Sequence, residues 1–257
     1  MNPIRRIRPL AGILASLAVA LLASSTVSPA AFAARMPVGA SALVSADNAD
    51  IAFQADTKIL WTSNGPGTGQ SLGLGMEAGT SPAITALPGG GYEAAFQANT
   101  GDLWVVDNGA GQDLGLGMKA GTSPAISTLA FGAGYEAAFQ ANTGDLWVVD
   151  NGVGQDLGLG MKTATSPAIA GLELGGYEAA FQANTGHLWA VQNGAGHDLG
   201  LGMKTATSPA ITALPGDGYE AAFQANTGLL WVAPNGIGQN TGLGMLTATS
   251  PAISILL

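Results

Sequence analysis

The eleven residues GYEAAFQANTG at positions 91–101 recur without change from Gly134, Gly176 and Gly218. A diverged copy, ADIAFQADTK, begins at Ala49, which makes five copies in a chain of 257 residues. One tryptophan follows each copy, and the five tryptophans are spaced 43, 43, 42 and 42 residues apart. Because a fixed period of about 40–45 residues is typical of a four-stranded propeller blade, we expect an array of such units.

A single repeat, residues 81–121, is expected to form four short strands. Residues 81–87 are a short apolar stretch that ends in a Pro-Gly turn. Residues 92–98 alternate with a period of two, which is typical of a strand. An Asn-Thr-Gly turn leads to residues 103–107, whose aromatic and β-branched side chains suit a pleated sheet. After the Asn108-Gly109 turn, residues 114–118 are expected to form the outer strand.

Each repeat is apolar on both faces of its expected sheet. Small residues such as Ala94 and Ala95 allow neighbouring sheets to approach, and Phe96 and Trp104 fill the space between them. An open stack of such sheets would leave two uncovered ends, whereas a closed ring leaves none. We therefore expect the sheets to close into a ring.

The two ends of the repeat array suggest how the ring closes. The chain ends on a good copy of the first strand, SPAISILL at 250–257, whereas residues 41–46 match this strand poorly. We therefore expect an all-β, five-bladed β-propeller over residues 49–257, closed by a C-terminal "velcro" strand that completes the blade begun near Ile51. Residues 34–48 would form a linker. A β-solenoid is the alternative, although its coils are usually shorter, at about 20–30 residues.

The first 33 residues have the pattern of a secretory signal peptide. Arg5, Arg6 and Arg8 precede an apolar run at 10–23, and Ala31-Phe32-Ala33 matches a cleavage site. The apolar run is too short for a membrane span of about 20 residues. We expect cleavage near Ala33 and a secreted protein, and Arg5-Arg6 leaves twin-arginine export open as an alternative route.

Composition excludes several classes of function. After cleavage, 17 acidic residues would face only five basic ones, a balance that argues against nucleic acid and anionic membranes as partners. The chain has no cysteine, so disulfides and thiolate chemistry are excluded. His187 and His197 are the only histidines and both fall in the fourth repeat, so no histidine site recurs around the array.

The repeat pattern AFQANTG…LW…GLGM…TSPAI resembles the repeats of two groups of propeller lectins. These are the tachylectin-2-type five-bladed propellers and the PLL-like bacterial propeller lectins. The likeness extends from about Ile51 to the C-terminus. It implies a carbohydrate-binding protein in which each blade, or each gap between blades, offers one shallow monosaccharide pocket.

Four recurring residue types are candidates for contact with a sugar. A tryptophan face can stack on a pyranose ring, although burial in the blade core is the alternative that we favour. The glutamate of each repeat can accept hydroxyl hydrogen bonds, or it can be a strand-end charge. The glutamine can instead make a structural bond between blades, which we favour, and the asparagine is a turn former first. The candidate ligand-binding residues are Glu93, Glu136, Glu178, Glu220, Gln97, Gln140, Gln182, Gln224, Trp104, Trp147, Trp189, Trp231, Asn108, Asn151, Asn193 and Asn235, with Asp50 at the glutamate position of the first repeat.

Catalysis and metal binding find little support in the pattern. Glycoside hydrolysis needs two carboxylates in different environments, whereas a repeated carboxylate provides five similar ones. The stretch from Asp107 to Asp113 could suggest a calcium loop, but the first copy of it has no carboxylate. We expect no enzyme activity, no cofactor and no metal.

The sequence therefore predicts a secreted lectin with up to five equivalent sites for neutral glycans, as a monomer or a small homo-oligomer. Five weak sites on one rigid molecule would gain avidity on a multivalent surface. The alternative is a protein-binding or cell-surface scaffold propeller without sugar specificity.

Overall fold

The computed structural model describes residues 42–44, 49–132 and 134–255, with side chains described from Asp50 onward. The signal peptide expected over 1–33, most of the expected linker and the last two residues lie outside this part of the chain.

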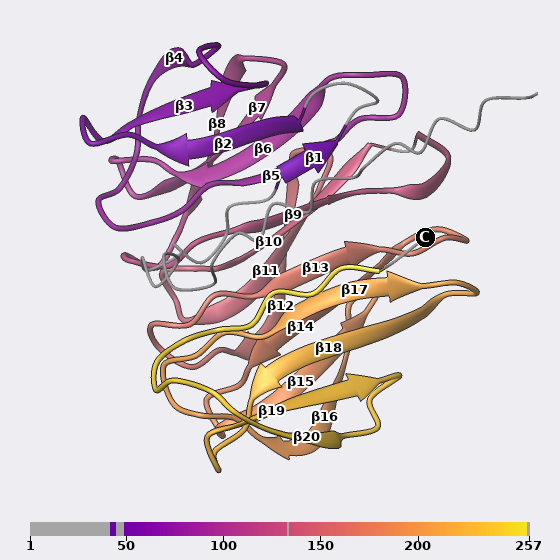
Figure 1. Ribbon diagram of the computed structural model, residues 1–257. Helices are drawn as coiled ribbons and strands as arrows, with labels where there is room; N and C mark the ends of the chain where they lie inside the picture. The colour runs from indigo at the N-terminus through magenta and orange to yellow at the C-terminus, as the bar shows by residue number, and fades with distance from the viewer. Residues whose placement is uncertain (1–41, 45–48, 133, 256–257) are drawn as a thin grey trace, which may run out of the picture. The chain divides into compact units, whose positions relative to one another are not determined.

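Five antiparallel sheets of four strands make up the fold, and each sheet uses four consecutive strands (Figure 1). The predicted all-β array of four-stranded repeats is therefore confirmed. Sheet I holds β1 (Ala42–Val44), β2 (Ala49–Gln54), β3 (Ile59–Ser63) and β4 (Gln70–Gly75). Sheet II holds β5 (Ala83–Ala86), β6 (Tyr92–Gln97), β7 (Asp102–Asp107) and β8 (Ala110–Gly117). Sheet III holds β9 (Ala125–Thr128), β10 (Tyr135–Gln140), β11 (Asp145–Asp150) and β12 (Val153–Gly160), with a short 3₁₀ turn at Ala130–Gly132. Sheet IV holds β13 (Ala168–Gly171), β14 (Tyr177–Gln182), β15 (His187–Gln192) and β16 (Ala195–Gly202). Sheet V holds β17 (Ala210–Leu214), β18 (Gly218–Gln224), β19 (Leu229–Pro234) and β20 (Gln239–Gly244).

The Asn-Gly pairs form the tight turns that the sequence predicts. Asn108 and Gly109 have φ values of 47° and 92°, and the copies in sheets III to V are alike. Two successive positive φ angles define the turn type that joins β7 to β8 with the twist of a hairpin. Asn108 also ties this turn to the neighbouring hairpin, because its Oδ1 accepts a hydrogen bond from the backbone N–H of Tyr92 at 3.0 Å.

Alternation along β6 divides its side chains between the two neighbouring sheets. Ala94 and Phe96 pack with Ala52 and Leu60 of the preceding sheet. The intervening Ala95 belongs instead to the cluster that holds Phe139 of the next sheet. Both faces of a central sheet are therefore buried, which explains why its strands are apolar throughout.

Backbone hydrogen bonds join the outer part of each sheet to the next sheet. The backbone N–H of Asn184 donates to the carbonyl of Gly160 at 3.0 Å, and Asn99, Asn142 and Asn226 make the same bond to the glycine of their preceding sheet. The glycine leaves room for the amide of Asn184, because a Cβ at Gly160 would lie 2.5 Å from Asn184 Nδ2.

A series of serines connects the innermost parts of the repeats. The backbone N–H of Ser81 donates to Ser123 Oγ, Ser123 donates to Ser166 Oγ, and Ser166 donates to Ser208 Oγ, each at 2.9 Å. Ser208 in turn donates to Ser250 Oγ at 2.9 Å. The C-terminal segment thus enters the serine series at the place that the inner strand of a following blade would take.

The first sheet differs from the expected arrangement. Residues 42–44, placed in the linker by the sequence, form β1 and pair with β2 in the register Ala42↔Ile51. β1 supplies the partner that the backbone N–H and C=O groups of the β2 edge require. The C-terminal residues 250–255, expected to fill this place, belong to no strand in the structure.

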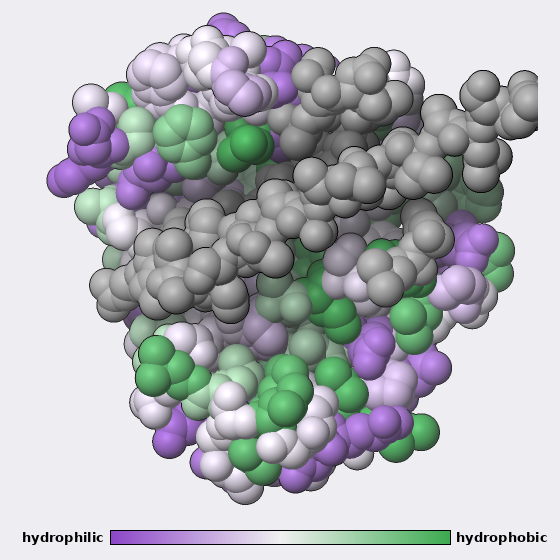
Figure 2. Space-filling view, viewed as in Figure 1, coloured by the Kyte–Doolittle hydropathy of each residue, from purple (hydrophilic) through white to green (hydrophobic). Residues whose placement is uncertain are grey.

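The outward faces of the first and last sheets are less covered than the others. Phe53 of sheet I is 38% exposed, whereas its counterparts in the other four sheets are fully buried. At the other end, Leu243 of β20 is 62% exposed, and Figure 2 shows apolar (green) atoms at the surface in its lower part, where Figure 1 places β19 and β20.

Candidate functional site

A small cavity lies between sheets III and IV. Its volume is about 150 Å³, and it is smaller than the ~300–1,000 Å³ of pockets for drug-sized ligands. Sheet III contributes the Gly-Leu-Gly stretch 158–160, and sheet IV contributes Phe181, Asn184, Thr185 and Trp189. The cavity therefore combines an aromatic wall with exposed polar turn residues, which suits a small ligand that has one apolar face and several hydroxyls.

Trp189 is held in place by its cross-strand partner. It pairs with Phe181 on β14, and the two ring centroids lie 6.1 Å apart with their planes inclined by 45°. Aromatic pairs prefer such tilted arrangements over a face-to-face sandwich. Trp189 is only partly buried, unlike Phe181, so it is both a packing residue and a wall of the cavity.

The parts of this cavity recur at each junction between neighbouring sheets. Every repeat has the tilted Phe–Trp pair, with centroid distances between 6.1 and 6.4 Å. At the four junctions between successive sheets, the Asn of the Asn-Thr-Gly turn contacts the glycine of the preceding sheet. The indole N–H of all five tryptophans is buried without a hydrogen-bond partner among the described residues.

The predicted glutamates lie elsewhere, deep between the sheets. Glu93, Glu136 and Glu178 are 5%, 7% and 2% exposed, and the fourth, Glu220, is partly exposed. Burial, followed by the nearby Asp107 carboxylate, raises the pKa of Glu93 to about 7. Burial and Asp150 raise the pKa of Glu136 to about 8, and burial raises the pKa of Glu178 to about 7.

Each buried glutamate faces a tyrosine of the next sheet. Burial and then the charge of Glu93 raise the pKa of Tyr135 to about 12, and Glu136 acts on Tyr177 in the same way. Glu93 pairs with Asp107, whereas Phe96, three residues further along β6, pairs with Trp104. The glutamate and the tryptophan therefore occupy different parts of the sheet. They also lie on opposite faces, because Glu93 alternates with Phe96 along β6.

A second cavity, of about 180 Å³, occupies the glutamate end of the junction between sheets I and II. It is lined by Asp50, Tyr92 and Asn108 together with hydroxyl and amide groups of sheet I. Asp50 is one methylene shorter than the glutamate of the other repeats, which leaves this space open. A carboxylate and a turn asparagine, two of the candidate types from the sequence, therefore lie in one cavity here, and no tryptophan lines it.

The predicted glutamines are structural in position. Gln97, Gln140, Gln182 and Gln224 are fully buried, and each donates its Nε2 hydrogens to backbone carbonyls of the loop that leads to the next repeat. Gln182, for example, donates to Met203 O at 3.3 Å and to Lys204 O at 3.4 Å. The bonds are structural, but they run to the loop that follows the outer strand of the same sheet and not between blades, the arrangement that we favour from the sequence.

The predicted asparagines lie in their expected turns, away from the tryptophan cavity. Asn108, Asn151, Asn193 and Asn235 use Oδ1 to accept the backbone N–H of the tyrosine that begins the second strand of the same sheet. Asn108 Nδ2 also donates to Asp107 Oδ1 at 2.8 Å, so the candidate calcium loop is a bonded hairpin. Within the described ranges no three metal-ligating side chains come together.

Sequence reasoning missed two components of the tryptophan cavity. The sequence pattern predicts only a turn at Asn184 and Thr185, and only an outer strand at Gly158 and Gly160. The available signal is their recurrence near the tryptophan, complete for the glycines and broken for the asparagine only by Asp56 in the first repeat. Of the predicted types, only tryptophan lines this cavity, through Trp189, and Trp104, Trp147 and Trp231 share its pairing with phenylalanine.

No protein-family model matches the chain, and no curated protein is significantly similar to it in sequence. None of the described residues forms a helix that could cross a membrane. Solved structures do share the fold. The lectin of Aleuria aurantia, described as a six-bladed β-propeller with a fucose recognition mode, aligns at a TM-score of 0.55 and 15% identity over 84% of this chain and 80% of its own.

Two other solved structures align at similar levels. The AofleA protein of Arthrobotrys oligospora gives a TM-score of 0.53 at 12% identity over 80% of this chain and 73% of its own. The virginiamycin B lyase of Staphylococcus aureus gives 0.52 at 13% over 80% and 70%. At these identities the likeness concerns the fold alone, and it does not extend to blade number or ligand. The chain is thus similar in fold to β-propeller proteins that include both a lectin and an enzyme.

Proposed function

We propose that this protein is a carbohydrate-binding lectin that holds one sugar at each junction between neighbouring blades, against the tryptophan. The observation that carries the proposal is the repeated cavity architecture: a partly exposed indole, an Asn-Thr turn and a facing Gly-Leu-Gly stretch. The indole offers an apolar face, and the turn offers amide and hydroxyl groups that exchange hydrogen bonds with sugar hydroxyls.

The neighbours of the same fold support this choice of ligand class. Structures of the Aleuria aurantia lectin are described in complex with Fucα1-6GlcNAc and with α-methyl-L-fucoside. A methyl fucoside is therefore a reasonable first probe for this chain, followed by other neutral monosaccharides. The lectin class implies binding without turnover, although the lyase among the neighbours makes an activity control necessary.

The proposal includes a five-bladed ring closed by the C-terminal segment. The serine series has five members, one per repeat, and four of the five possible links are present, from Ser81 to Ser250. A bond from the backbone N–H of Ser250 to Ser81 Oγ would complete the cycle. In that arrangement Ile253 would oppose Ile51, as Ile84 opposes Ala94 in sheet II, and it would take the place that Ala42 holds in the structure.

Paired cysteines can test this closure, because the chain has none of its own. The variant Ile51→Cys with Ile253→Cys should form an intramolecular disulfide on mild oxidation, since directly opposed strand residues have suitable Cα distances. The matched variant Ile51→Cys with Ala42→Cys reports the β1 pairing instead. Oxidation of only the second variant would refute closure by the C-terminal segment.

Secretion and multivalency complete the proposal. We propose that the chain is exported and cleaved after Ala33, so that the N-terminus of the mature protein begins at Ala34. Mass spectrometry of the exported protein measures this directly. Five weak sites on one molecule would bind a dense glycan surface far more tightly than a free monosaccharide.

A scaffold function is the second candidate, and exposed apolar loops favour it. Phe131 and Leu174, in the hairpins that lead into β10 and β14, are 86% and 70% exposed. In a scaffold these two side chains would belong to a larger apolar patch, the kind of surface that binds protein. Competition separates the two functions, because millimolar methyl fucoside or another simple sugar should release a lectin from its target and leave a protein complex intact.

The direct test of the lectin proposal is titration of the mature protein, residues 34–257, with monosaccharides by calorimetry. The variant Trp189→Ala should lose a site, and Gln192→Ala, which changes an exposed side chain at the other end of β15, should not lose a site. Unchanged binding in a variant that lacks all five tryptophan side chains but remains folded would contradict the proposal.

A further inference from the structure

Two positions beside each tryptophan do not carry the same residues in all five sheets. The first lies two residues before the tryptophan, and so points to the same face of the strand. The second is the direct cross-strand partner of the tryptophan on the outer strand. Both side chains therefore lie on the same face of the sheet as the indole. In sheet IV they flank the cavity, since neither of them lines it.

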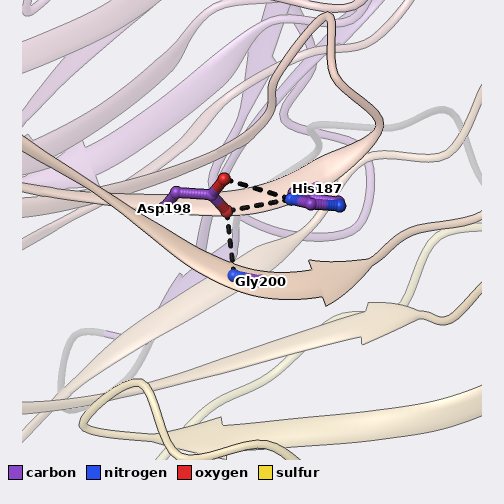
Figure 3. Close-up of polar contacts among 3 residues, drawn as sticks. All are labelled: His187, Asp198 and Gly200. Atoms are coloured by element: carbon purple, nitrogen blue, oxygen red, sulfur yellow. Dashed lines mark hydrogen bonds and ion pairs between the residues drawn. The ribbon is translucent and has the colours of Figure 1, made fainter.

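Sheet IV shows the geometry of such a pair. His187 precedes Trp189, and Asp198 opposes it. His187 Nδ1 lies 3.1 Å from both carboxylate oxygens of Asp198, and the two side chains are 41% and 38% exposed (Figure 3). The backbone N–H of Gly200 also donates to Asp198 Oδ1 at 2.8 Å. These bonds hold the pKa of Asp198 below its usual value.

Sheets II and III place two carboxylates at the same positions. Asp113 opposes Trp104 and Asp156 opposes Trp147, in the register of sheet IV. Their Oδ1 atoms accept the backbone N–H of Gly115 and Gly158 at 2.9 and 2.8 Å, so both take the Asp198 conformation. The position of His187 is taken by Asp102 in sheet II and by Asp145 in sheet III. Among the described residues, no cationic side chain forms an ion pair with these four aspartates.

Sheets I and V carry no charge at these positions. In sheet V they hold Leu229 and Asn240, and in sheet I they hold Ile59 and Ser71. Asn240 keeps the local turn, because its Oδ1 accepts the backbone N–H of Gly242 at 2.9 Å. The loop geometry is thus retained while the charge beside the indole is removed.

We propose that these residue pairs make the sugar sites unequal, so that the sites of Trp104 and Trp147 select sugars with a protonated amino group. The inference rests on the proposed lectin function and refines it. An ammonium group on the sugar would meet two carboxylates at these sites and the negative face of the indole ring. The sites of Trp61 and Trp231 offer no such charge, and the site of Trp189 has its carboxylate occupied by His187.

The five indole N–H groups allow each site to be observed separately. In ¹H–¹⁵N spectra of the mature protein the five tryptophans give five indole signals, which single Trp→Phe variants assign. Glucosamine and N-acetylglucosamine are the probes, because acetylation removes the charge of the amine. At about pH 6 the amine is mostly charged, because the neighbouring sugar oxygens lower its pKa only to about that of an α-amino group, near 8.

Glucosamine should shift the Trp104 and Trp147 signals at concentrations about threefold to tenfold lower than those that shift the Trp231 signal. We expect this ratio because one or two exposed charge contacts contribute about 0.5–1.5 kcal/mol to binding. N-acetylglucosamine should shift the Trp104, Trp147 and Trp231 signals at similar concentrations. In Asp102→Asn with Asp113→Asn, Trp104 should respond like Trp231. The control Asp107→Asn with Asp150→Asn removes the same number of charges from the far end of the sheets and should leave the order unchanged.

The reverse change supplies a gain of selectivity. Leu229→Asp with Asn240→Asp should bring the Trp231 signal to the glucosamine sensitivity of Trp104. Equal responses of all five signals to glucosamine, or an unchanged order in the Asp102 and Asp113 double variant, would overturn the inference while leaving the lectin proposal intact. If no tested sugar shifts any indole signal, it is the lectin proposal itself that fails.

Discussion

At the scale of single residues, an alanine occupies a strained turn position in three repeats. Ala164, Ala206 and Ala248 have φ values of 63°, 61° and 62°, in the left-handed region. The equivalent positions of the first two repeats hold Gly79 and Gly121, with φ of 79° and 76°. Left-handed backbone costs an L-residue about 1–2 kcal/mol, and glycine avoids this cost.

The variant Ala164→Gly should therefore be more stable, by roughly 0.5–1 kcal/mol once the greater freedom of glycine in the unfolded chain is deducted. The matched variant Gly121→Ala should be less stable by a similar amount, since the space around Gly121 is open and only the backbone angle opposes a side chain. Urea unfolding measures both. A loss of stability in Ala164→Gly would show that the turn differs from the structure.

Single residues also show where prediction from the sequence ends. Alternation placed Glu93 and Gln97 on one face, which the strand pairing confirms. Alternation assigns a residue to a face of the sheet but not to a depth between the sheets, so it could not show that Glu93 and Gln97 are both buried. Structural and ligand-binding residues both recur in every repeat, so recurrence alone does not distinguish Gln97 from Trp104 as a candidate.

At the scale of elements, the serine series offers a test of how the inner parts of the repeats are joined. Ser166→Ala should lower the free energy of unfolding by about 1–3 kcal/mol, because it leaves the buried backbone N–H of Ser123 without a partner. Ser81→Ala should lower the free energy of unfolding by a similar amount only if the backbone N–H of Ser250 donates to Ser81 Oγ in a closed ring. A negligible effect at Ser81 beside a large one at Ser166 would favour an open array.

The strands themselves were predicted well, and their limits have physical reasons. Period-two alternation and Asn-Gly turns act locally, so strands such as β6 and β7 lie where the pattern placed them. The partner of β2 depends on contacts between distant segments, and the pattern favoured residues 250–257 where the structure has β1. Three residues with little sequence signal are enough to form a short edge strand.

At the scale of the whole molecule, three buried carboxyl groups make stability depend on pH. The pKa values of Glu93, Glu136 and Glu178 rise from 4.5 to about 7, 8 and 7 in the folded protein. Between about pH 4.5 and pH 8 the folded state therefore binds more protons than the unfolded state, so the free energy of unfolding falls as the pH rises.

Thermal unfolding should show this loss as a melting temperature several degrees lower at about pH 9 than at about pH 5. The variant Glu136→Gln cannot ionise at this position and should lose less stability on the alkaline side than the wild type. Asp56→Asn, a change in an exposed carboxylate, serves as the control for net charge. A melting temperature of Glu136→Gln that falls as steeply as that of the wild type would show that this glutamate is not buried as described.

The central claim is that the junctions between blades bind sugar. The measurement that tests it most directly is a glycan array with the labelled mature protein, residues 34–257, followed by competition with the free monosaccharide of any hit. The account predicts binding to a related set of glycans, including fucosylated ones, that millimolar monosaccharide abolishes and that Trp→Ala substitutions weaken site by site. A blank array with correctly folded protein would contradict it and would favour a protein partner for the exposed loops of Phe131 and Leu174.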